Sequence, residues 1–407
     1  MGKIKYGVIG IKGFGELHCR FAREHERIEL VALVDKDEDA VKFKAKEFGV
    51  KGFTDYRQML NEGIVDAVSI VTPHYLHSVI GLDCLKAGVH IFVEKPIAIR
   101  ISEADDMIQV AKNNNLKICV GHQYRVHRTS KTMKHLIDTG AVGNIKRVLW
   151  SWGLFRPEKY FARDSWRTTW EHAGSGVLMP HAIHDLDLIC WMMGRPIRVN
   201  AMLANQLHEI ACEDMVCANI LFENGALASF QATLNQPEAY SIRQVAGEKG
   251  IIIIQNLKSM TYDYKDRILF GQFKHDLHTA LTKLSGILDQ PKISWQTVKP
   301  IGDPPVWKKL LERVGLMRIE KRHGLSALME SFVQAILNGG KPIVDGESAA
   351  TALELVNGII LSAFREKTVS LPLDRKEYDE LFDELCSGKT KISKYRARDF
   401  CNTSSML

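Results

Sequence analysis

The alternation of apolar and amphipathic segments over the first 120 residues most constrains how this chain can fold. Apolar runs predict strands at 4–9, 29–34, 67–71, 89–93 and 117–121, and helical spacing predicts helices between them at 15–26, 37–48, 56–62, 77–87 and 102–114. Strands that alternate with helices in this way form βαβ units, and successive βαβ units build a parallel sheet. The sequence therefore predicts an N-terminal α/β domain of the Rossmann type.

A glycine-rich turn follows the first predicted strand and opens a helix. A dinucleotide site needs glycines there for the tight turn, for close approach of the pyrophosphate and for helix packing. Lys12 stands where the usual middle glycine would be, with Gly13 beside it. We expect this turn to hold the cofactor, with Lys12 reaching a phosphate; its residues are Gly10, Lys12, Gly13, Phe14 and Gly15.

Two further strand ends fit a dinucleotide. Asp35 ends the second strand, where a carboxylate accepts hydrogen bonds from the adenosine ribose and repels a 2′-phosphate. It favours NAD over NADP, although an aspartate here can also cap the next helix. Thr72 and Pro73 end the third strand, and His74 and His77 follow them towards the start of the next helix, a natural place for the cofactor to pass.

The fourth strand ends abruptly in Glu94, Lys95 and Pro96. In an open α/β sheet, ligands bind at the carboxyl ends of the strands. A partly dehydrated lysine beside a carboxylate can be tuned for proton transfer. A salt-bridged surface lysine is the alternative interpretation of Lys95.

Composition narrows the class of protein. A length of 407 residues suggests about two domains, and the net charge of +6 is spread along the chain except for a basic tail after Ser387. No basic stripe interleaved with aromatics predicts nucleic-acid binding. The 8 cysteines form no CxxC pair, which favours reduced thiols in a cytoplasmic protein and no metal site. The first strand begins too early for a signal peptide, and no apolar run reaches the ~20 residues of a membrane span.

The pattern changes from about residue 145, where strands are predicted at 145–154, 197–206, 214–222, 226–234, 241–247 and 250–255, with a helix at 176–193. These segments predict an α+β domain with a large, mainly antiparallel sheet, one face of which covers the site while the other forms a homodimer or homotetramer. The predicted domains are 1–122 for the cofactor, 123–374 for substrate and assembly, and 375–407 as a helix and basic tail. Within the second domain, residues 257–320 are expected to form an insertion with amphipathic segments at 275–288 and 307–314. Helix 324–338 is expected to pack back on the first domain.

The glycine turn, Asp35, Thr72-Pro73 with His77, and the segment from Ala87 to Pro96 together resemble the Gfo/Idh/MocA family, named for glucose–fructose oxidoreductase and inositol dehydrogenase. The GxHxxxEKP element is the most specific motif, and the resemblance covers about residues 3–255 and 322–374. It implies an NAD-dependent oxidoreductase in which Lys95 lies at the nicotinamide end of the cofactor and assists proton transfer.

The second half carries the rest of the resemblance. His184 falls on the catalytic histidine of the family and Asp187 on the acid that follows it, but Pro180 stands where the family has an aspartate or asparagine. A proline side chain can neither hydrogen-bond a substrate nor polarise a histidine. His181 and His184 are three residues apart and so share a helix face; both are candidate catalytic residues, with packed histidines as the alternative.

Two further segments are candidates for substrate binding. Arg156, Trp166 and Arg167 lie in a stretch that resembles the loop of sugar-oxidising members, and an interface loop is the alternative. Aromatic and guanidinium groups there can stack on and hydrogen-bond a polyol. After the fifth strand come His122, Gln123, Tyr124 and Arg125. Arg125 matches an arginine that family members carry near the substrate, and His122 or Gln123 stands where members often have an asparagine.

The resemblance therefore predicts an NAD-dependent dehydrogenase for a secondary hydroxyl of a sugar, sugar derivative or cyclitol, with Lys95 and His184 as acid–base groups. One alternative is an enzyme that retains NAD and cleaves or epimerises a sugar through transient oxidation. The other is a non-catalytic regulator that senses NAD or sugar; the two acid–base candidates argue against it, because a sensor needs no proton relay.

Overall fold

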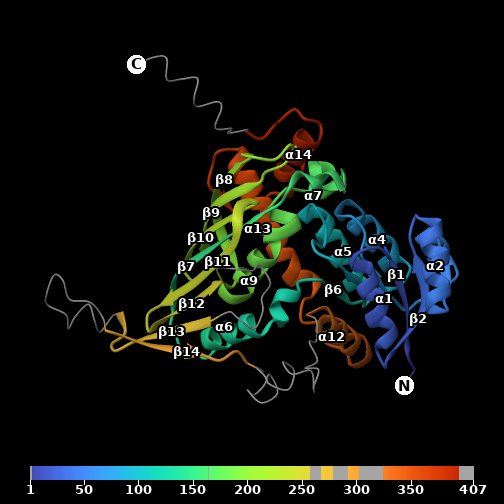
Figure 1. Cartoon of the computed structure of the whole chain (residues 1–407), viewed down its shortest axis with the longest axis horizontal. Helices are drawn as coiled ribbons and strands as arrows, with labels where there is room; N and C mark the ends of the chain where they lie inside the picture. Colours follow the sequence, from blue (N-terminus) through green and yellow to red (C-terminus); the bar gives the residue numbers. More distant parts are fainter. Residues whose placement is uncertain (1, 164, 257–266, 278–291, 302–323, 394–407) are drawn as a thin grey trace.

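The computed structural model describes residues 2–163, 165–256, 267–277, 292–301 and 324–393 (Figure 1). The amphipathic segments predicted at 275–288 and 307–314 lie almost wholly outside these ranges, as does most of the basic tail.

The first sheet has six strands, and every ladder in it is parallel. Their order is β3-β2-β1-β4-β5-β6, with bounds Lys51–Phe53, Ile28–Val34, Ile4–Ile9, Ala67–Ile70, His90–Val93 and Ile118–Val120. The order reverses between β1 and β4, and in such sheets ligands bind outside the carboxyl ends of the strands at that point. The predicted parallel sheet is confirmed. Strand β3 was not predicted, because three residues with one buried side chain leave too short a pattern.

Helices connect these strands and cover the sheet. They are α1 (Phe14–Glu24), α2 (Glu38–Phe48), α3 (Tyr56–Asn61), α4 (His77–Lys86) and α5 (Ile101–Asn113), all within a few residues of the predicted bounds. Helix α12 (Gly324–Asn338), from late in the chain, packs against α1, β5 and β6.

The second sheet has nine strands in the order β14-β13-β12-β11-β7-β10-β9-β8-β15. Their bounds are Ile293–Val298, Arg267–Phe273, Gly250–Asn256, Asn235–Gly247, Ile145–Phe155, Leu227–Thr233, Met215–Phe222, Pro196–Ala204 and Val369–Ser370. All ladders are antiparallel except the one between β7 and β10, so the predicted α+β domain is confirmed. Strands β13 and β14 were not predicted; they come from the insertion and extend one edge of the sheet.

Helices α9 (Ile183–Met193) and α13 (Gly346–Phe364) connect the two sheets. Helix α13 packs against β8 and α9 on one side and against α5 on the other, and Figure 1 shows it between the two parts of the molecule. A single π-helical turn, Leu178–Ala182, precedes α9. Three short helices were not predicted, namely α6 (Arg128–Asp138), α7 (Glu158–Arg163) and α8 (Trp170–Ala173), and α14 (Arg375–Cys386) ends the described chain. None of the described helices has the length and apolarity needed to cross a lipid bilayer.

Candidate active site

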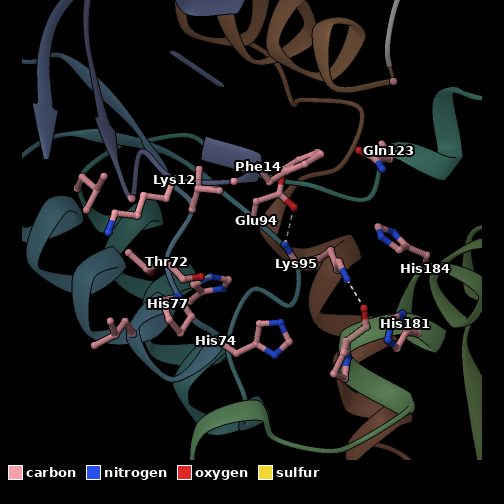
Figure 2. Close-up of a pocket in the computed structure, with 18 of the residues that line it drawn as sticks. Lys12, Phe14, Thr72, His74, His77, Glu94, Lys95, Gln123, His181 and His184 are labelled. Carbon is pink, nitrogen blue, oxygen red and sulfur yellow. Dashed lines mark hydrogen bonds between the residues drawn. The ribbon is translucent and has the colours of Figure 1, made fainter. Parts of the chain in front are cut away.

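A cavity of about 1910 Å³ runs from the glycine turn, along the carboxyl ends of the parallel strands, to the π-helical turn. Figure 2 shows Lys12 and Thr72 on one side of Lys95, and His181 and His184 on the other. The structure therefore brings most of the predicted site residues together at one cavity. The predicted residues that line it are Gly10, Lys12, Gly13, Phe14, Asp35, Thr72, Pro73, His74, His77, Glu94, Lys95, Gln123, Tyr124, Arg156, Trp166, Arg167, His181 and His184.

The glycine turn is shaped for close backbone approach. Gly10 has a φ of 88°, and a Cβ there would lie 2.6 Å from the carbonyl oxygen of Val71. A Cβ on Gly15 would lie 1.9 Å from the carbonyl oxygen of Gly10. Gly15 is not among the residues that line the cavity, so its role is to let α1 pack against the turn. A turn with glycines at its points of close backbone approach, in front of a helix N-terminus, fits a dinucleotide pyrophosphate.

Asp35 lies at the end of β2 and lines the cavity. Its carboxylate accepts hydrogen bonds from the backbone N–H groups of Ile11 and Asp37, each at 3.1 Å. The capping role that we considered for Asp35 belongs to Asp37, whose side chain accepts from Ala40 N at 3.0 Å. Lys12 forms an ion pair with Asp37, and this hydrogen bond raises the pKa of Lys12. The predicted phosphate contact of Lys12 stays a prediction.

Thr72, His74 and His77 shape the middle of the cavity. The ring nitrogens of His77 lie 2.7 Å from the carbonyl oxygen of Pro96 and 2.8 Å from that of Thr72, so this buried ring connects the ends of β4 and β5. His74 Nδ1 lies 2.8 Å from the carbonyl oxygen of Ala173. Burial lowers the pKa of both histidines. Thr72 Oγ1 is buried with no hydrogen-bond partner in the described part of the chain, which leaves it for a ligand.

Lys95 lies where the two domains face each other across the cavity. Its Nζ donates a hydrogen bond of 2.5 Å to the carbonyl oxygen of Pro180, drawn as a dashed line in Figure 2. Burial lowers the pKa of Lys95 to about 8; Glu94 opposes this shift, and the guanidinium groups of Arg167 and Arg156 add to it. An amine with this pKa can exchange a proton with a ligand near neutral pH.

His184 and His181 lie on the opposite wall of the cavity from the cofactor turn. The ring of His184 stacks on Tyr124, with a centroid separation of 4.3 Å, and its buried Nδ1 has no partner among the described residues. His181 Nε2 lies 3.3 Å from the hydroxyl of Tyr160. Burial, followed by the charges of Lys95 for His184 and of Arg156 for His181, lowers the pKa of each histidine well below its usual value. Both rings are therefore neutral at pH 7.

Arg125 differs from its prediction as a substrate-binding residue. It does not line the cavity, because its guanidinium forms a buried two-point ion pair with Asp187 at 2.8 and 2.5 Å. The same guanidinium lies 3.4 Å from the carbonyl oxygen of Ile343 and 3.3 Å from Ser348 Oγ. Arg125 therefore connects the segment after β6 to α9 and α13.

A buried carboxylate supports the π-helical turn that carries His181. Glu213 accepts hydrogen bonds of 3.0 Å from each of the backbone N–H groups of Gly176, Val177 and Leu178. These are the free donors at the start of the helical segment, where a negative charge is favourable. Burial nevertheless raises the pKa of Glu213 to about 7, and the three hydrogen bonds oppose this shift. Sequence reasoning missed Glu213; the only signal was an acidic pair, Glu213 and Asp214, at the start of an apolar strand.

Other residues in and around the cavity were also missed, among them His18, Asp185 and Tyr160. His18 on α1 is buried, with Nδ1 2.8 Å from Ser69 Oγ and Nε2 3.1 Å from a carboxylate oxygen of Glu94. Asp185 lines the cavity and accepts a hydrogen bond of 2.7 Å from Trp150 Nε1. Tyr160 also lines the cavity. Each follows a residue or motif that we did identify, but only the packing places its side chain at the site.

Comparison with family models gives two matches that follow the two sheets. The model described as "Oxidoreductase family, NAD-binding Rossmann fold" matches residues 4–122. The model of the GFO/IDH/MocA C-terminal domain matches residues 130–253.

Comparison with curated proteins finds relatives of similar length. The chain is 26% identical over 392 residues to 2,7-anhydro-N-acetylneuraminate hydratase of Escherichia coli, covering 90% of this chain and 97% of the relative. It is 26% identical over 366 residues to levoglucosan dehydrogenase of Pseudarthrobacter phenanthrenivorans, covering 81% and 86%.

Among solved structures, the WlbA dehydrogenase of Bordetella pertussis in complex with NADH and UDP-GlcNAcA superposes with a TM-score of 0.73. Its sequence is 23% identical, and the match covers 91% of this chain and 100% of that one. This likeness shows that the two-domain fold is shared.

Proposed function

This chain belongs to the Gfo/Idh/MocA family of oxidoreductases, with an NAD-binding Rossmann fold, and from this premise we propose that it oxidises a secondary hydroxyl of a sugar, sugar derivative or cyclitol. The observation that carries the proposal is Lys95, an amine with a lowered pKa held against the carbonyl oxygen of Pro180 within the cavity. The levoglucosan dehydrogenase relative supports the substrate class.

The residues at the strand ends fit NAD. Gly10 and Gly13 offer a backbone that the pyrophosphate can approach, and the carboxylate of Asp35 is positioned for the ribose hydroxyls. A 2′-phosphate would meet the charge of Asp35, which favours NAD over NADP. When bound, NAD supplies the hydride acceptor.

Lys95 and His184 are the acid–base groups of the proposed reaction. The substrate loses a hydride from its carbinol carbon and a proton from its hydroxyl, two electrons in all, and becomes a carbonyl compound. The neutral amine of Lys95 accepts the hydroxyl proton, and the neutral ring of His184 hydrogen-bonds the same oxygen. The carbonyl oxygen of Pro180 accepts a hydrogen bond from the amine and holds it in place.

The first prediction tests Lys95. Replacing it by alanine should lower turnover by about 10²–10⁴-fold, because proton transfer by a positioned group contributes about that much. NAD affinity, followed by quenching of protein fluorescence, should change little. Lys86→Ala, which removes an exposed lysine at the end of α4, is the matched control and should keep full activity. Full turnover in Lys95→Ala would contradict the assignment.

A second candidate reaction has no net redox change. Relatives that match about nine-tenths of this chain are named hydratases, and hydration neither consumes nor produces NADH overall. In such a reaction NAD would be reduced and reoxidised within one turnover. A substrate that is converted by the NAD-loaded protein without NADH release would select this candidate. A panel of polyols and glycosides that yields neither NADH nor product would favour the non-catalytic sensor.

A further inference from the structure

We propose that the substrate end of the cavity binds an anionic sugar, and that Arg156, together with Arg167, holds the carboxylate or phosphate of that sugar. This inference rests on the proposed function, because it names the substrate class of the same site. It concerns the wall formed by β7 and the loop after it, opposite the cofactor turn.

The charges around the cavity favour an anion at this end. The carboxylates among its described lining residues are Asp35, Asp55, Glu94 and Asp185. Asp35 and Asp55 lie at the ends of β2 and β3, towards the cofactor. Asp185 already accepts hydrogen bonds from Trp150 and forms a buried ion pair with Arg243 at 3.2 Å. Among the described lining residues, Glu94 is the carboxylate nearest in sequence to Lys95, and it opposes the effect of Arg156 and Arg167 on the pKa of that lysine.

Both guanidinium groups gather around one aromatic ring. The Arg156 guanidinium lies 4.6 Å from the centre of the Tyr160 ring, and that of Arg167 lies 5.4 Å from it. The hydroxyl of the same tyrosine lies 3.3 Å from His181 Nε2, and His181 follows the residue that holds Lys95. The two arginines thus form one positively charged wall beside the candidate acid–base groups, and their charges lower the pKa of both Lys95 and His181.

Arg156 has a fixed backbone and an unused donor. Its N–H donates to the carbonyl oxygen of Leu234 at 3.1 Å, and its own carbonyl oxygen lies 2.6 Å from His208 Nε2. His208 is buried, and its Nδ1 lies 3.1 Å from a carboxylate oxygen of Asp214. The Nε of Arg156, in contrast, is buried and has no hydrogen-bond partner among the residues that the structure describes. The fold therefore holds this arginine firmly while leaving its side-chain donor for a ligand.

The chemistry of guanidinium suits a sugar acid or a sugar phosphate. Its planar donors match two oxygens of a carboxylate or phosphate, and such charge-assisted hydrogen bonds are stronger than neutral ones. Trp166 and Tyr160 also line the cavity, and the guanidinium groups of the two arginines lie over their rings. A neutral polyol would offer the buried Nε of Arg156 no charged acceptor.

The test compares matched neutral and anionic sugars on the NAD-loaded protein. The probes are glucose, glucuronate and glucose 6-phosphate, the corresponding galactose series, and N-acetylneuraminate as a larger sugar acid. Binding is measured by calorimetry and turnover by NADH release or product analysis. At least one anionic probe should bind about tenfold or more tightly than its neutral counterpart, with a margin that shrinks as salt is added. Comparing the uronates with the sugar phosphates shows which anionic group the site prefers.

Substitutions at Arg156 test whether this residue causes the preference for anionic sugars. Arg156→Gln should weaken binding of the preferred anion by about 10–100-fold, as expected for lost hydrogen bonds to a charged group, and change NAD affinity little. Arg156→Lys should recover part of the loss, because it keeps the charge but not the two-point geometry. Arg198→Gln, which removes an exposed arginine from β8 outside the cavity, is the matched control and should bind like the wild type.

Two outcomes separate this inference from the proposed function. Equal kcat/KM for neutral and anionic sugars, unchanged in Arg156→Gln, would overturn the anionic class while the dehydrogenase proposal stands. A panel in which NAD binds but no sugar of either kind binds or reacts would overturn both.

Discussion

At the scale of single residues, the proton path depends on how Lys95 is held. The side-chain acid expected before His184 is replaced by Pro180, and the structure shows that the backbone of Pro180 takes the contact instead. A carbonyl oxygen accepts a hydrogen bond from the ammonium group but carries no full charge. It therefore stabilises protonated Lys95 less than a carboxylate would, while burial lowers the pKa of this lysine to about 8.

The pH dependence distinguishes the two acid–base candidates. If Lys95 accepts the proton, kcat/KM for oxidation should rise with pH through about 8 and then level off, because only the neutral amine accepts a proton. The reverse reduction needs the ammonium form and should fall over the same range. If His184 is the acceptor, oxidation should already be level above pH 6.5, because burial keeps the pKa of His184 well below that value.

The measurement is kcat/KM from pH 5.5 to 9.5 in both directions. Lys95→Ala provides the control, since its residual activity should lose the step near pH 8. A step that persists in the variant would mean that another group is responsible.

At the scale of elements, the π-helical turn before α9 positions both candidate histidines. Its first backbone N–H groups are held by the buried carboxylate of Glu213, which comes from the start of β9. The second sheet thus fixes the element that faces Lys95. A Cβ at Gly176 would lie 1.9 Å from the carbonyl oxygen of Glu213, so the approach of these two segments requires a glycine at that position.

Glu213→Gln should weaken this support. Glutamine has one acceptor oxygen in place of two, and its amide N–H groups would face a backbone N–H donor. We expect the free energy of unfolding to fall by about 1–3 kcal/mol, the usual cost of leaving a buried donor unsatisfied. Thermal and denaturant unfolding followed by circular dichroism measure this change.

The control for that variant is Glu223→Gln, at an exposed position after β9, which should leave stability within about 0.5 kcal/mol of the wild type. Wild-type stability in Glu213→Gln would show that the helix start does not depend on the carboxylate.

At the scale of the whole molecule, one buried ion pair connects segments that are far apart in the chain. Arg125, just after the first sheet, pairs with Asp187 on α9 and also lies beside Ile343 and Ser348 near the start of α13. Their side chains are 4% and 0% exposed, so neither charge has water to compensate for the loss of its partner. The pair therefore maintains the arrangement of the two domains around the cavity.

Removing one partner of the Arg125–Asp187 ion pair should lower the free energy of unfolding. Arg125→Met leaves a buried, uncompensated carboxylate, and we expect a loss of about 3–5 kcal/mol in the free energy of unfolding. The double variant Arg125→Met/Asp187→Leu should recover much of it, because two apolar side chains of similar size leave no unpaired charge. Chemical denaturation of the three proteins measures the difference, and a double variant less stable than the single one would contradict this explanation.

The assembly of the molecule and the exact domain boundaries stay predictions. A homodimer or homotetramer through the second sheet fits a sheet with helices α9 and α13 on one face. Light scattering of the purified protein measures the oligomer size.

The sequence by itself determined the fold class and the location of the site. Hydrophobic periodicity is a local signal, so both sheets, most helices and the strand ends with Asp35 and Lys95 followed from it. The segments that escaped were the three residues of β3, which leave too short a pattern, the strands β13 and β14, and the helices α6, α7 and α8.

Tertiary structure decided which side chains face the cavity and which serve the fold. Arg125 matched a family position but pairs with Asp187. Glu213 gave only the weak signal of an acidic pair, and His18 and Tyr160 gave none. The physical reason is that hydrogen bonds and ion pairs at the site join residues tens to hundreds of positions apart. No local pattern records such a contact; the hydrogen bond from Lys95 to the backbone of Pro180, across 85 positions, exists only once both domains have folded.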